Sequence, residues 1–357
     1  MRTANETSKQ SIETYIMDQA QALLSIDSPS GYTREAADHV MKELMELGYE
    51  PVMTIKGGVL VCLGKGSQSD VKEGALLLGA HLDTLGGMVK EITPEGRLKL
   101  SPIGGLNPNN AEAENCRIIT REKKIYTGTF QLENASLHVN NKYNEKKRAF
   151  PDMEVLIDEI VTNAAEVKAL GIGIGDIVAF EPRTIVTESG YIKSRFLDDK
   201  LCVAIMLGYA KRLKEMKAEL KRTVYLYITV FEEVGHGSAA AIPTDVTEVI
   251  SVDMGCVGDG LECDETMVSI CAKDSSGPYH YEVVSALIDA AKESGVPYAV
   301  DVYPYYSSDA DAALASGHEI RHGLIGPGVY ASHGYERSHV KGVNATAELL
   351  YHYTAKD

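Results

Sequence analysis

The stretch Thr223–Gly237, TVYLYITVFEEVGHG, combines a strand signal with an acidic ending. It starts as a run of β-branched and aromatic residues, which is the composition of a buried strand. It ends in two adjacent carboxylates, Glu232 and Glu233, followed by a glycine-containing turn. Because side chains alternate sides along a strand, one of these glutamates can bind a metal ion while the other moves a proton. The alternative is an acidic pair that is only solvated, as most glutamates are.

Composition is that of a globular protein. The 357 residues are 44% hydrophobic and 24% charged, and this length accommodates one large domain or two ordinary ones. The net charge of −16 argues against nucleic acid or an anionic membrane as a partner. No apolar run is long enough to span a bilayer, and the polar start of the chain lacks the apolar segment of a secretory signal.

The cysteines point to a reducing compartment. They are scattered without a CxxC pair, and several lie in apolar contexts. We expect reduced thiols in a cytoplasmic protein at all six positions: Cys62, Cys116, Cys202, Cys256, Cys263 and Cys271.

Helix and strand signals alternate over the first 85 residues. Apolar residues recur at helical spacing over 16–24 and again over 37–47, and Thr33 is the expected N-cap of the second helix. Strands are expected over 59–63 and 75–80. This alternation predicts an α/β fold.

The second of these strands leads into His81-Leu82-Asp83. By period-2 alternation, His81 and Asp83 share a face at the carboxyl end of the strand, where open α/β sheets bind their ligands. An imidazole there can bind a metal ion while a nearby carboxylate orients the ring. A histidine that ends a strand is also often only a polar terminus.

The span from about Gly86 to Gly190 has a different character. Short strands with turn signals replace the alternation of helices and strands, as at Lys90–Gly96. The glycine-rich LGIGIGD at Leu170–Asp176 has GxGxG spacing and no strand–turn–helix frame, so it predicts a tight β-loop and no nucleotide site. We interpret the span as an inserted, mostly β domain.

α/β character resumes at Asp198 and Asp199, which precede a long predicted helix over 201–220. Carboxylates at a helix start are often simple caps that the helix dipole favours, but one carboxylate can also give an oxygen to each of two metal ions. A further strand ends in Asp253, and a loop near the end of the sequence carries His333.

Five potential ligands therefore lie at strand ends, at a helix start or in a loop: His81, Asp198, Glu233, Asp253 and His333. Such a set suits a pair of divalent ions a few ångströms apart. A mixture of imidazole and carboxylate ligands favours zinc, cobalt or manganese over calcium, which prefers oxygen ligands alone.

Six short motifs occur in order along the sequence: PSGY at 29–32, GAHLDTLG at 79–86, LDDK at 197–200, FEEVG at 231–235, SVDMG at 251–255 and SHGYE at 332–336. In these motifs the sequence resembles the M42 family of metallo-aminopeptidases, which includes glutamyl, deblocking and tetrahedral aminopeptidases. The motifs span almost the whole chain, and their shared order and spacing argue against chance agreement.

The resemblance implies a mixed-sheet α/β metallopeptidase catalytic domain formed by residues 1–85 and 191–357. The inserted β-rich span, residues 86–190, would be a dimerisation domain. It also implies a homo-oligomer, a dimer or by analogy a hollow dodecamer. The implied activity is that of a dinuclear metal-dependent aminopeptidase, which hydrolyses N-terminal residues from short peptides with a metal-activated water.

The resemblance also implies which residues hold each ion. His81 and Asp253 would hold one divalent ion, and Glu233 and His333 would hold the other. Asp198 would bridge the two ions.

Roles beside the ions follow from the same resemblance. The bond between Asp198 and Asp199 is often cis in such enzymes. Asp83 would orient His81, and Glu232 would act as the general base.

The chain departs from the family pattern around the expected substrate rim. SSDA at 307–310 stands where GTDA is usual, KGG at 56–58 replaces part of a DxxGN pattern, His236 follows EEVG, and Tyr330 replaces an arginine. The candidate substrate contacts are therefore Asp309, Tyr330 and His236.

Three functions stay open at this point. The first is an aminopeptidase that acts on short peptides. The second is an amidohydrolase with the same machinery that acts on a blocked or modified dipeptide such as an osmolyte amide, a branch that the ending YASHGYERSH at 330–339 resembles. The third is a catalytically silent scaffold, against which the presence of Glu232 and all five potential ligands argues.

Overall fold

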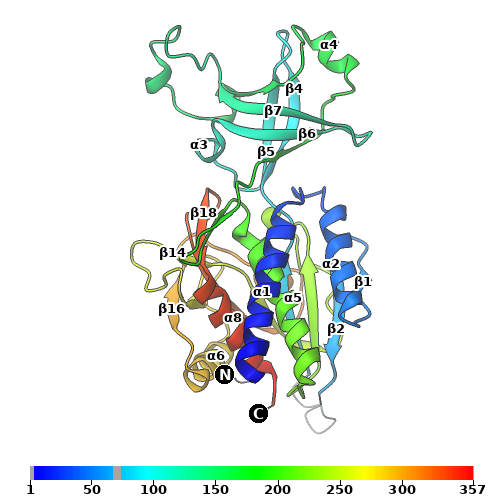
Figure 1. Ribbon diagram of the computed structural model, residues 1–357, viewed down its shortest axis with the longest axis vertical. Helices are drawn as coiled ribbons and strands as arrows, with labels where there is room; N and C mark the ends of the chain where they lie inside the picture. Colours follow the sequence, from blue (N-terminus) through cyan, green and yellow to red (C-terminus); the bar gives the residue numbers. More distant parts are fainter. Residues whose placement is uncertain (1–3, 67–73, 357) are drawn as a thin grey trace.

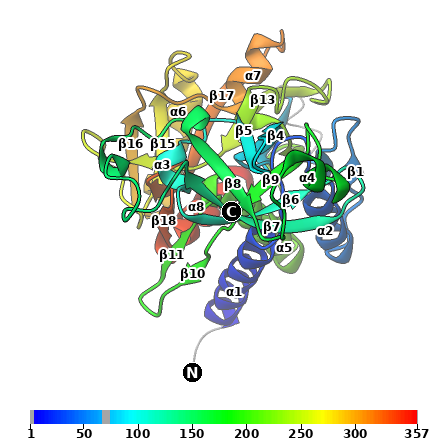
Figure 2. The same ribbon diagram turned by 90° about the horizontal axis from the view of Figure 1, so that it is seen from above.

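The computed structural model describes residues 4–66 and 74–356. They form two parts stacked along the long axis of the molecule, a large α/β part and a small β part (Figure 1). Seen from above, the strands of the small part lie over one end of the large part (Figure 2).

Within the described residues, the large part is built on a twelve-stranded sheet. Its main path runs in the order β1 (Val52–Met53), β2 (Val59–Gly64), β12 (Val224–Thr229), β3 (Ala75–His81), β13 (Val246–Val252), β17 (Arg321–Tyr330), β18 (Glu336–His339), β11 (Tyr191–Ser194) and β10 (Ile185–Val186). Three further strands join it: β14 (Gly255–Val257) and β15 (Val268–Lys273) pair with β17, and β16 (Tyr298–Val302) pairs with β15.

The centre of the sheet is parallel and its flanks are antiparallel. Strands β12, β3, β13 and β17 run in one direction, whereas β2 and β18 run against them. Every residue of β3 is buried, as expected for a parallel strand covered on both faces. The four parallel strands therefore end at the same edge of the sheet, the edge at which α/β sheets bind ligands.

Helices complete the large part: α1 (Ala4–Leu24), α2 (Arg34–Glu46), α5 (Leu197–Met216), α6 (Tyr281–Ser294), α7 (Asp309–Ala315) and α8 (Val340–Thr354). Helix α5 packs against β3 and also against α1 and α8, so it is buried on nearly all sides. No helix among the described residues is long and apolar enough to cross a membrane.

Two details of the helices differ from the sequence expectation. Helix α5 was expected to reach residue 220, but it ends at Met216 because Lys217 adopts a left-handed conformation with φ 48°. The chain then turns so that Leu220 pairs with Ala355 as an isolated bridge. Thr33 does precede α2, but its side chain makes no capping hydrogen bond.

The small part is a closed barrel formed by β4 (Gly86–Ile92), β5 (Leu98–Ile103), β8 (Met153–Ile157), β7 (Ile125–Leu132), β6 (Glu114–Ile119) and β9 (Ile177–Phe180). Closure pairs every strand and leaves no open sheet edge. Phe130 and Phe180 meet edge to face in its interior. Short helices α3 (Pro108–Ala111) and α4 (Ala164–Ala169) lie in its loops.

The expected fold class is confirmed, because a mixed α/β sheet carries a separate β-rich insertion. The hairpin formed by β10 and β11 pairs with β18 in the large sheet, so the expected boundary at residue 190 falls inside this hairpin. The exact domain boundaries stay predictions.

A single glycine sets how closely α1 approaches α5. A Cβ atom at Gly208 would collide with the side chain of Ile16, which is fully buried. The two helices can therefore approach this closely only because residue 208 has no side chain.

The substitution Gly208→Ala is expected to lower the free energy of unfolding by about 1–3 kcal/mol, the usual cost of overpacking. This cost outweighs the helix-propensity gain of alanine over glycine, which is about 1 kcal/mol. With Ile16→Ala in the background the collision is gone, so Gly208→Ala should become neutral or stabilising. Denaturation of the four variants measures this coupling. Equal destabilisation in both backgrounds would contradict the packing argument.

Candidate metal centre

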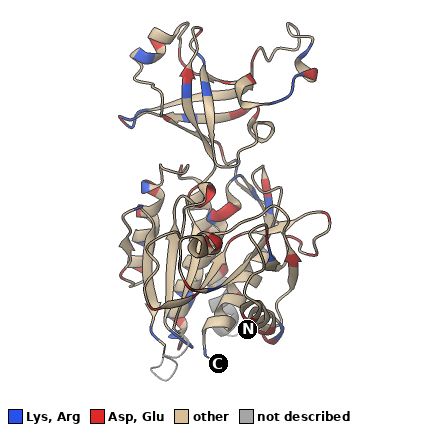
Figure 3. Cartoon of the chain, turned by 180° about the vertical axis from the view of Figure 1, so that it is seen from behind, with Lys and Arg blue, Asp and Glu red and all other residues tan. Residues whose placement is uncertain are grey.

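The parallel strands deliver potential ligands to one edge of the sheet. His81 is the last residue of β3, Asp253 follows β13, and Glu232 and Glu233 follow β12 in a short 3-10 turn. His333 follows β17, and Asp198 lies at the start of α5. Figure 3 shows acidic segments at the end of the large part that faces the barrel.

The backbone around these residues is unusual at several points. The peptide bond between Asp198 and Asp199 is cis, as the family resemblance leads us to expect. Phe196, Phe231 and His333 are non-glycine residues in the left-handed region, with φ values of 68°, 70° and 60°. Such conformations are costly and concentrate at functional sites.

Asp198 lies between the two histidines. Its Oδ1 is 3.0 Å from Nε2 of His81, and its Oδ2 is 3.6 Å from Nε2 of His333. The same nitrogen of His333 is 3.5 Å from Oε2 of Glu233. The two oxygens of one carboxylate therefore face two imidazoles that approach from different strands.

Two overlapping groups of residues have ligand atoms close enough to hold a metal ion. One group is His81, Asp198 and Glu233, and the other is His81, Asp199 and Asp253. Within each group all ligand atoms lie within 4.8 Å of one another. Oδ1 of Asp199 and Oε1 of Glu233 are buried without a hydrogen-bond partner, which is costly unless a cation satisfies them. These donors fit a divalent cation.

The electrostatics agree with that fit. Burial, with Asp198 nearby, raises the pKa of Glu233 well above its ordinary value and raises the pKa of Asp253 to about 7. Burial lowers the pKa of His81, but the carboxylates of Glu232 and Asp198 overcome this effect and raise it well above its ordinary value. Carboxylates crowded in this way repel one another, and divalent cations supply the positive charge that offsets this repulsion.

Comparison with known proteins agrees with this geometry. The family model of the M42 glutamyl aminopeptidases matches residues 58–349. The chain belongs to this family. YhfE of Bacillus subtilis (strain 168) is 44% identical over 337 residues, which cover 94% of this chain and 96% of that protein.

Solved structures share the fold. An aminopeptidase from the archaeon Desulfurococcus kamchatkensis aligns with a TM-score of 0.83 at 21% identity, over 96% of this chain and 94% of that one. The Pyrococcus horikoshii TET1 peptidase aligns with a TM-score of 0.82 at 20% identity, over 94% of this chain and 98% of that one.

Membership of the M42 family confirms the resemblance and makes the chain a peptide hydrolase. The His and Asp cluster supports metal dependence. The role of each M42 ligand stays a prediction. Asp199, which we expected only as the partner of Asp198 in the cis bond, also offers a ligand oxygen. The position of the Asp199 carboxylate depends on the backbone at this peptide bond, and the alternation of side chains along a strand does not predict it.

Asp83 contacts His81 mainly through its backbone. Nδ1 of His81 is 2.9 Å from the carbonyl oxygen of Asp83, whereas the Asp83 carboxylate is 3.8 Å away. That carboxylate instead accepts hydrogen bonds from the Ser30 hydroxyl and, at 3.0 Å, from the backbone N–H of Glu232. The expected orienting role of Asp83 stays a prediction, and the structure adds a second contact that holds Glu232.

Glu336 is a positioning residue that sequence reasoning missed. Its Oε2 accepts a hydrogen bond from the backbone N–H of Asp198 at 3.1 Å, and its Oε1 accepts one from that of His333 at 3.0 Å. The side chain is buried. One carboxylate thus holds two potential ligands that are 135 residues apart in the sequence. The only signal was its place at the end of the SHGYE motif.

The barrel reaches the same site. The Asn110 side chain donates a hydrogen bond to the backbone carbonyl of His333 at 3.1 Å. A Cβ atom on Gly105 would lie only 2.7 Å from the His333 ring. The loop that follows β5 therefore packs directly against a potential ligand.

The three candidate substrate contacts lie apart from the pocket beside the ligands. Asp309 is buried, and its oxygens accept hydrogen bonds from the Thr229 hydroxyl and the Ser238 backbone N–H. His236 and Tyr330 are exposed. None of these three is among the described residues that line the pocket. Their role in substrate binding stays a prediction.

The pocket beside the ligands has a volume of about 480 Å³. Besides the potential ligands, its lining includes a set that we call the apolar lining: Met254, Leu261, Pro304, Tyr305 and Tyr306. The pocket therefore leaves an open volume next to the potential ligands.

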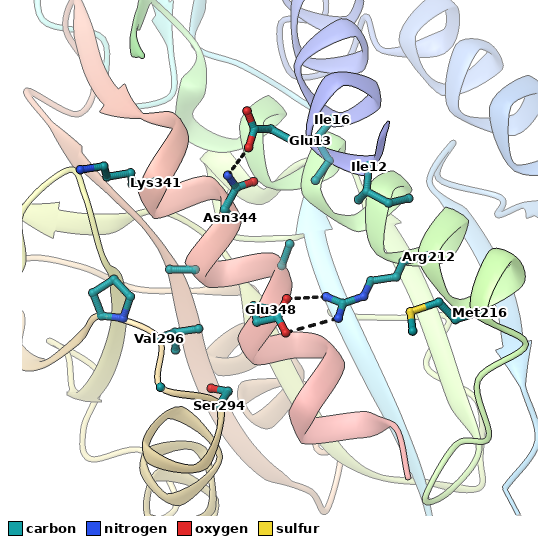
Figure 4. Close-up of a pocket in the computed structure, with 14 residues that line it drawn as sticks. Ile12, Glu13, Ile16, Arg212, Met216, Ser294, Val296, Lys341, Asn344 and Glu348 are labelled. Carbon is teal, nitrogen blue, oxygen red and sulfur yellow. Dashed lines mark hydrogen bonds and ion pairs between the residues drawn. The ribbon is translucent and has the colours of Figure 1, made fainter. Parts of the chain in front are cut away.

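Another pocket, of about 590 Å³, lies between α1, α5 and α8 (Figure 4). Its acidic groups already have protein partners, because Glu348 pairs with Arg212 and Glu13 accepts a hydrogen bond from Asn344. Neither potential metal group lies in it. The smaller pocket is therefore the candidate active site.

The substitution Glu336→Gln is expected to weaken metal binding by about 10–100-fold, the usual effect of losing a group that orients ligands. The amide nitrogen of glutamine would face a backbone N–H that needs an acceptor. Competition with a chelator measures the affinity. Glu265→Gln is the matched control, because Glu265 pairs with neighbouring Arg337 and not with a ligand. Unchanged metal affinity in Glu336→Gln would refute the positioning role.

Proposed function

We propose that this chain is a dinuclear metal-dependent aminopeptidase that removes N-terminal residues from short peptides. The observation that carries the proposal is the position of Asp198, whose two oxygens face His81 and His333. A carboxylate placed in this way suits a bridge between two cations. The M42 membership of the chain supports the same conclusion.

In this proposal His81 and Asp253 hold one ion, Glu233 and His333 hold the other, and Asp198 bridges them. Asp199 offers a ligand oxygen close to those of His81 and Asp253, so it could also contribute to the first ion. Imidazole and carboxylate donors suit zinc, cobalt or manganese. When bound, such a pair lowers the pKa of water toward neutrality and stabilises developing negative charge on oxygen.

Glu232 is the proposed general base. Its Oε2 is 3.7 Å from Nε2 of His81, yet Glu232 belongs to neither potential ligand group. The Asp83 carboxylate accepts a hydrogen bond from the backbone N–H of Glu232, and this contact limits the movement of Glu232. A carboxylate beside the cations can accept the proton of water and deliver it to the leaving amine.

The substrate is proposed to carry a free amine. This proposal rests on the M42 membership of the chain and on its similarity to curated aminopeptidases, enzymes that act on peptides with a free N-terminal amine. Activity toward acetylated but not free-amine substrates would favour the amidohydrolase alternative.

Replacement of the two adjacent glutamates should have different effects. Glu232→Gln keeps size and hydrogen bonding but cannot accept a proton, so kcat should fall by roughly 10²–10⁴-fold with metal content intact. Glu233→Gln replaces an anionic ligand with a neutral one, so it should weaken the binding of one ion and be partly rescued by excess metal. Metal titration and steady-state kinetics on both variants measure these effects.

Two outcomes would count against this assignment. If Glu232→Gln removed the metal while Glu233→Gln spared it, the two roles would be reversed. If neither variant affected metal content or rate, the pair would be a solvated strand end without a catalytic role.

The barrel is proposed to be a dimerisation domain. Several of its large apolar side chains are exposed in the single chain, among them Leu137, Val139, Ile160 and Ile174. Large apolar side chains exposed in this way can be buried in an interface between copies of the chain. The Pyrococcus horikoshii TET1 peptidase, with the same fold, can assemble into a tetrahedron or a large octahedral shell, which supports a homo-oligomer here.

We expect an assembly larger than the 38.7 kDa chain in sedimentation at micromolar concentration. The variants Ile160→Glu and Ile174→Glu, each tested singly, should weaken it, because a buried unpaired carboxylate is costly. Ile55→Glu is the control, since Ile55 is fully exposed on the large part. A monomeric native protein, or dissociation by the control variant alone, would contradict the proposal.

A further inference from the structure

Every charged residue in the described lining of the pocket beside the ligands already has a role in the proposed function. These are the residues that the proposed function assigns to the metal ions or to proton transfer: Asp198, Glu232, Glu233, Asp253 and His333. Among the described residues of the lining there is no lysine or arginine. A substrate side chain that enters this pocket therefore finds no cation that is free to pair with it.

The rest of the lining suits an uncharged side chain. Met254 and Leu261 are aliphatic, and Pro304, Tyr305 and Tyr306 extend the apolar lining. Met254 is buried and Leu261 and Tyr306 are half-buried, whereas Pro304 and Tyr305 are exposed at the rim. A carboxylate placed against the inner three would lose its hydration without gaining a partner, which is costly. Apolar groups placed there gain from burial instead.

Tyr306 is the polar member of the apolar lining. Its hydroxyl oxygen is buried without a hydrogen-bond partner. The hydroxyl lies beside the carboxylate of Asp253. The hydroxyl can donate one hydrogen bond, and a peptide carbonyl is a neutral acceptor for it.

The carboxylates of the site do not form a pocket for a basic side chain either. In the proposed function each of them binds a metal ion or moves a proton, so their charge is already used. The serines of the lining, Ser307 and Ser332, are exposed to solvent and are free to hydrate at the rim.

Building on the proposed aminopeptidase function, we propose that this site selects peptides whose N-terminal residue has an uncharged, apolar side chain. The apolar lining holds that side chain, and Tyr306 donates its hydroxyl hydrogen bond to the neutral peptide. N-terminal glutamate is rejected, although glutamyl aminopeptidase is the description of the family. Leucine and phenylalanine represent the preferred class.

The first test compares leucyl, phenylalanyl, glutamyl and lysyl amides that share one leaving group, with metal-loaded enzyme. We expect kcat/KM for the leucyl or phenylalanyl amide to exceed that for the glutamyl amide by about 100-fold or more. A glutamyl amide hydrolysed as well as, or better than, the leucyl amide would overturn the inference while leaving the proposed function intact.

The second test introduces a positively charged side chain into the apolar lining. Leu261→Arg should raise the ratio of glutamyl to leucyl activity by about 10-fold or more, because it gives the acidic side chain a partner. Leu261→Gln is the matched control, since it adds polarity and length without charge, and it should not produce this rise. Equal ratios in the two variants would overturn the assignment of Leu261 to the side-chain pocket.

A binding measurement separates failure of the inference from failure of the proposed function. Free leucine and free glutamate are added to the metal-loaded protein, and the unfolding midpoint is followed. Leucine should raise the midpoint at concentrations at which glutamate does not, and the reverse order would overturn the inference. If every amide is inert but leucine still binds selectively, the proposed catalytic function fails and the selectivity of the pocket stands.

Discussion

The crowding of carboxylates at one edge of the sheet is the constraint on which the rest of the molecule depends. Four parallel strands end together and bring buried acidic groups into a space where they repel one another. Neighbouring groups restrain this cluster through backbone hydrogen bonds, as Glu336 does for Asp198 and His333 and as Asp83 does for Glu232. The framework is arranged to hold negative charge that only cations can balance.

Strand ends made much of the site predictable. Strand signals in the sequence placed His81 and Asp253 at the carboxyl ends of buried strands, and the parallel sheet then brought them together. The resemblance to M42 peptidases supplied the pairing of residues, which spacing alone does not give. The β-rich character of the insertion was visible from turn signals, but closure into a barrel was not, because closure depends on the pairing of β4 with β9, which lie far apart in the sequence.

What the sequence did not reveal depends on tertiary contacts. Glu336 acts through two backbone N–H groups that only the fold brings near it, and no local pattern marks such a partner. The expected substrate contacts followed from departures in the family motifs, yet Asp309 is enclosed by Thr229 and Ser238. Gly237 is small enough for this approach, since a Cβ atom there would overlap the Asp309 carboxylate. A departure from a family motif indicates that the packing around these residues differs. It does not by itself indicate that they contact the substrate.

The contact between Asn110 and His333 has a consequence for the order of events during synthesis on the ribosome. His81 emerges first, the whole barrel follows, and His333 emerges long afterwards. In the part of the chain that the structure describes, the barrel strands pair with one another alone, so the barrel can fold while the remaining chain is still being made. His333 then docks against a surface that already exists. The candidate site therefore needs segments that leave the ribosome at widely separated times, and it cannot be complete before His333 has been made.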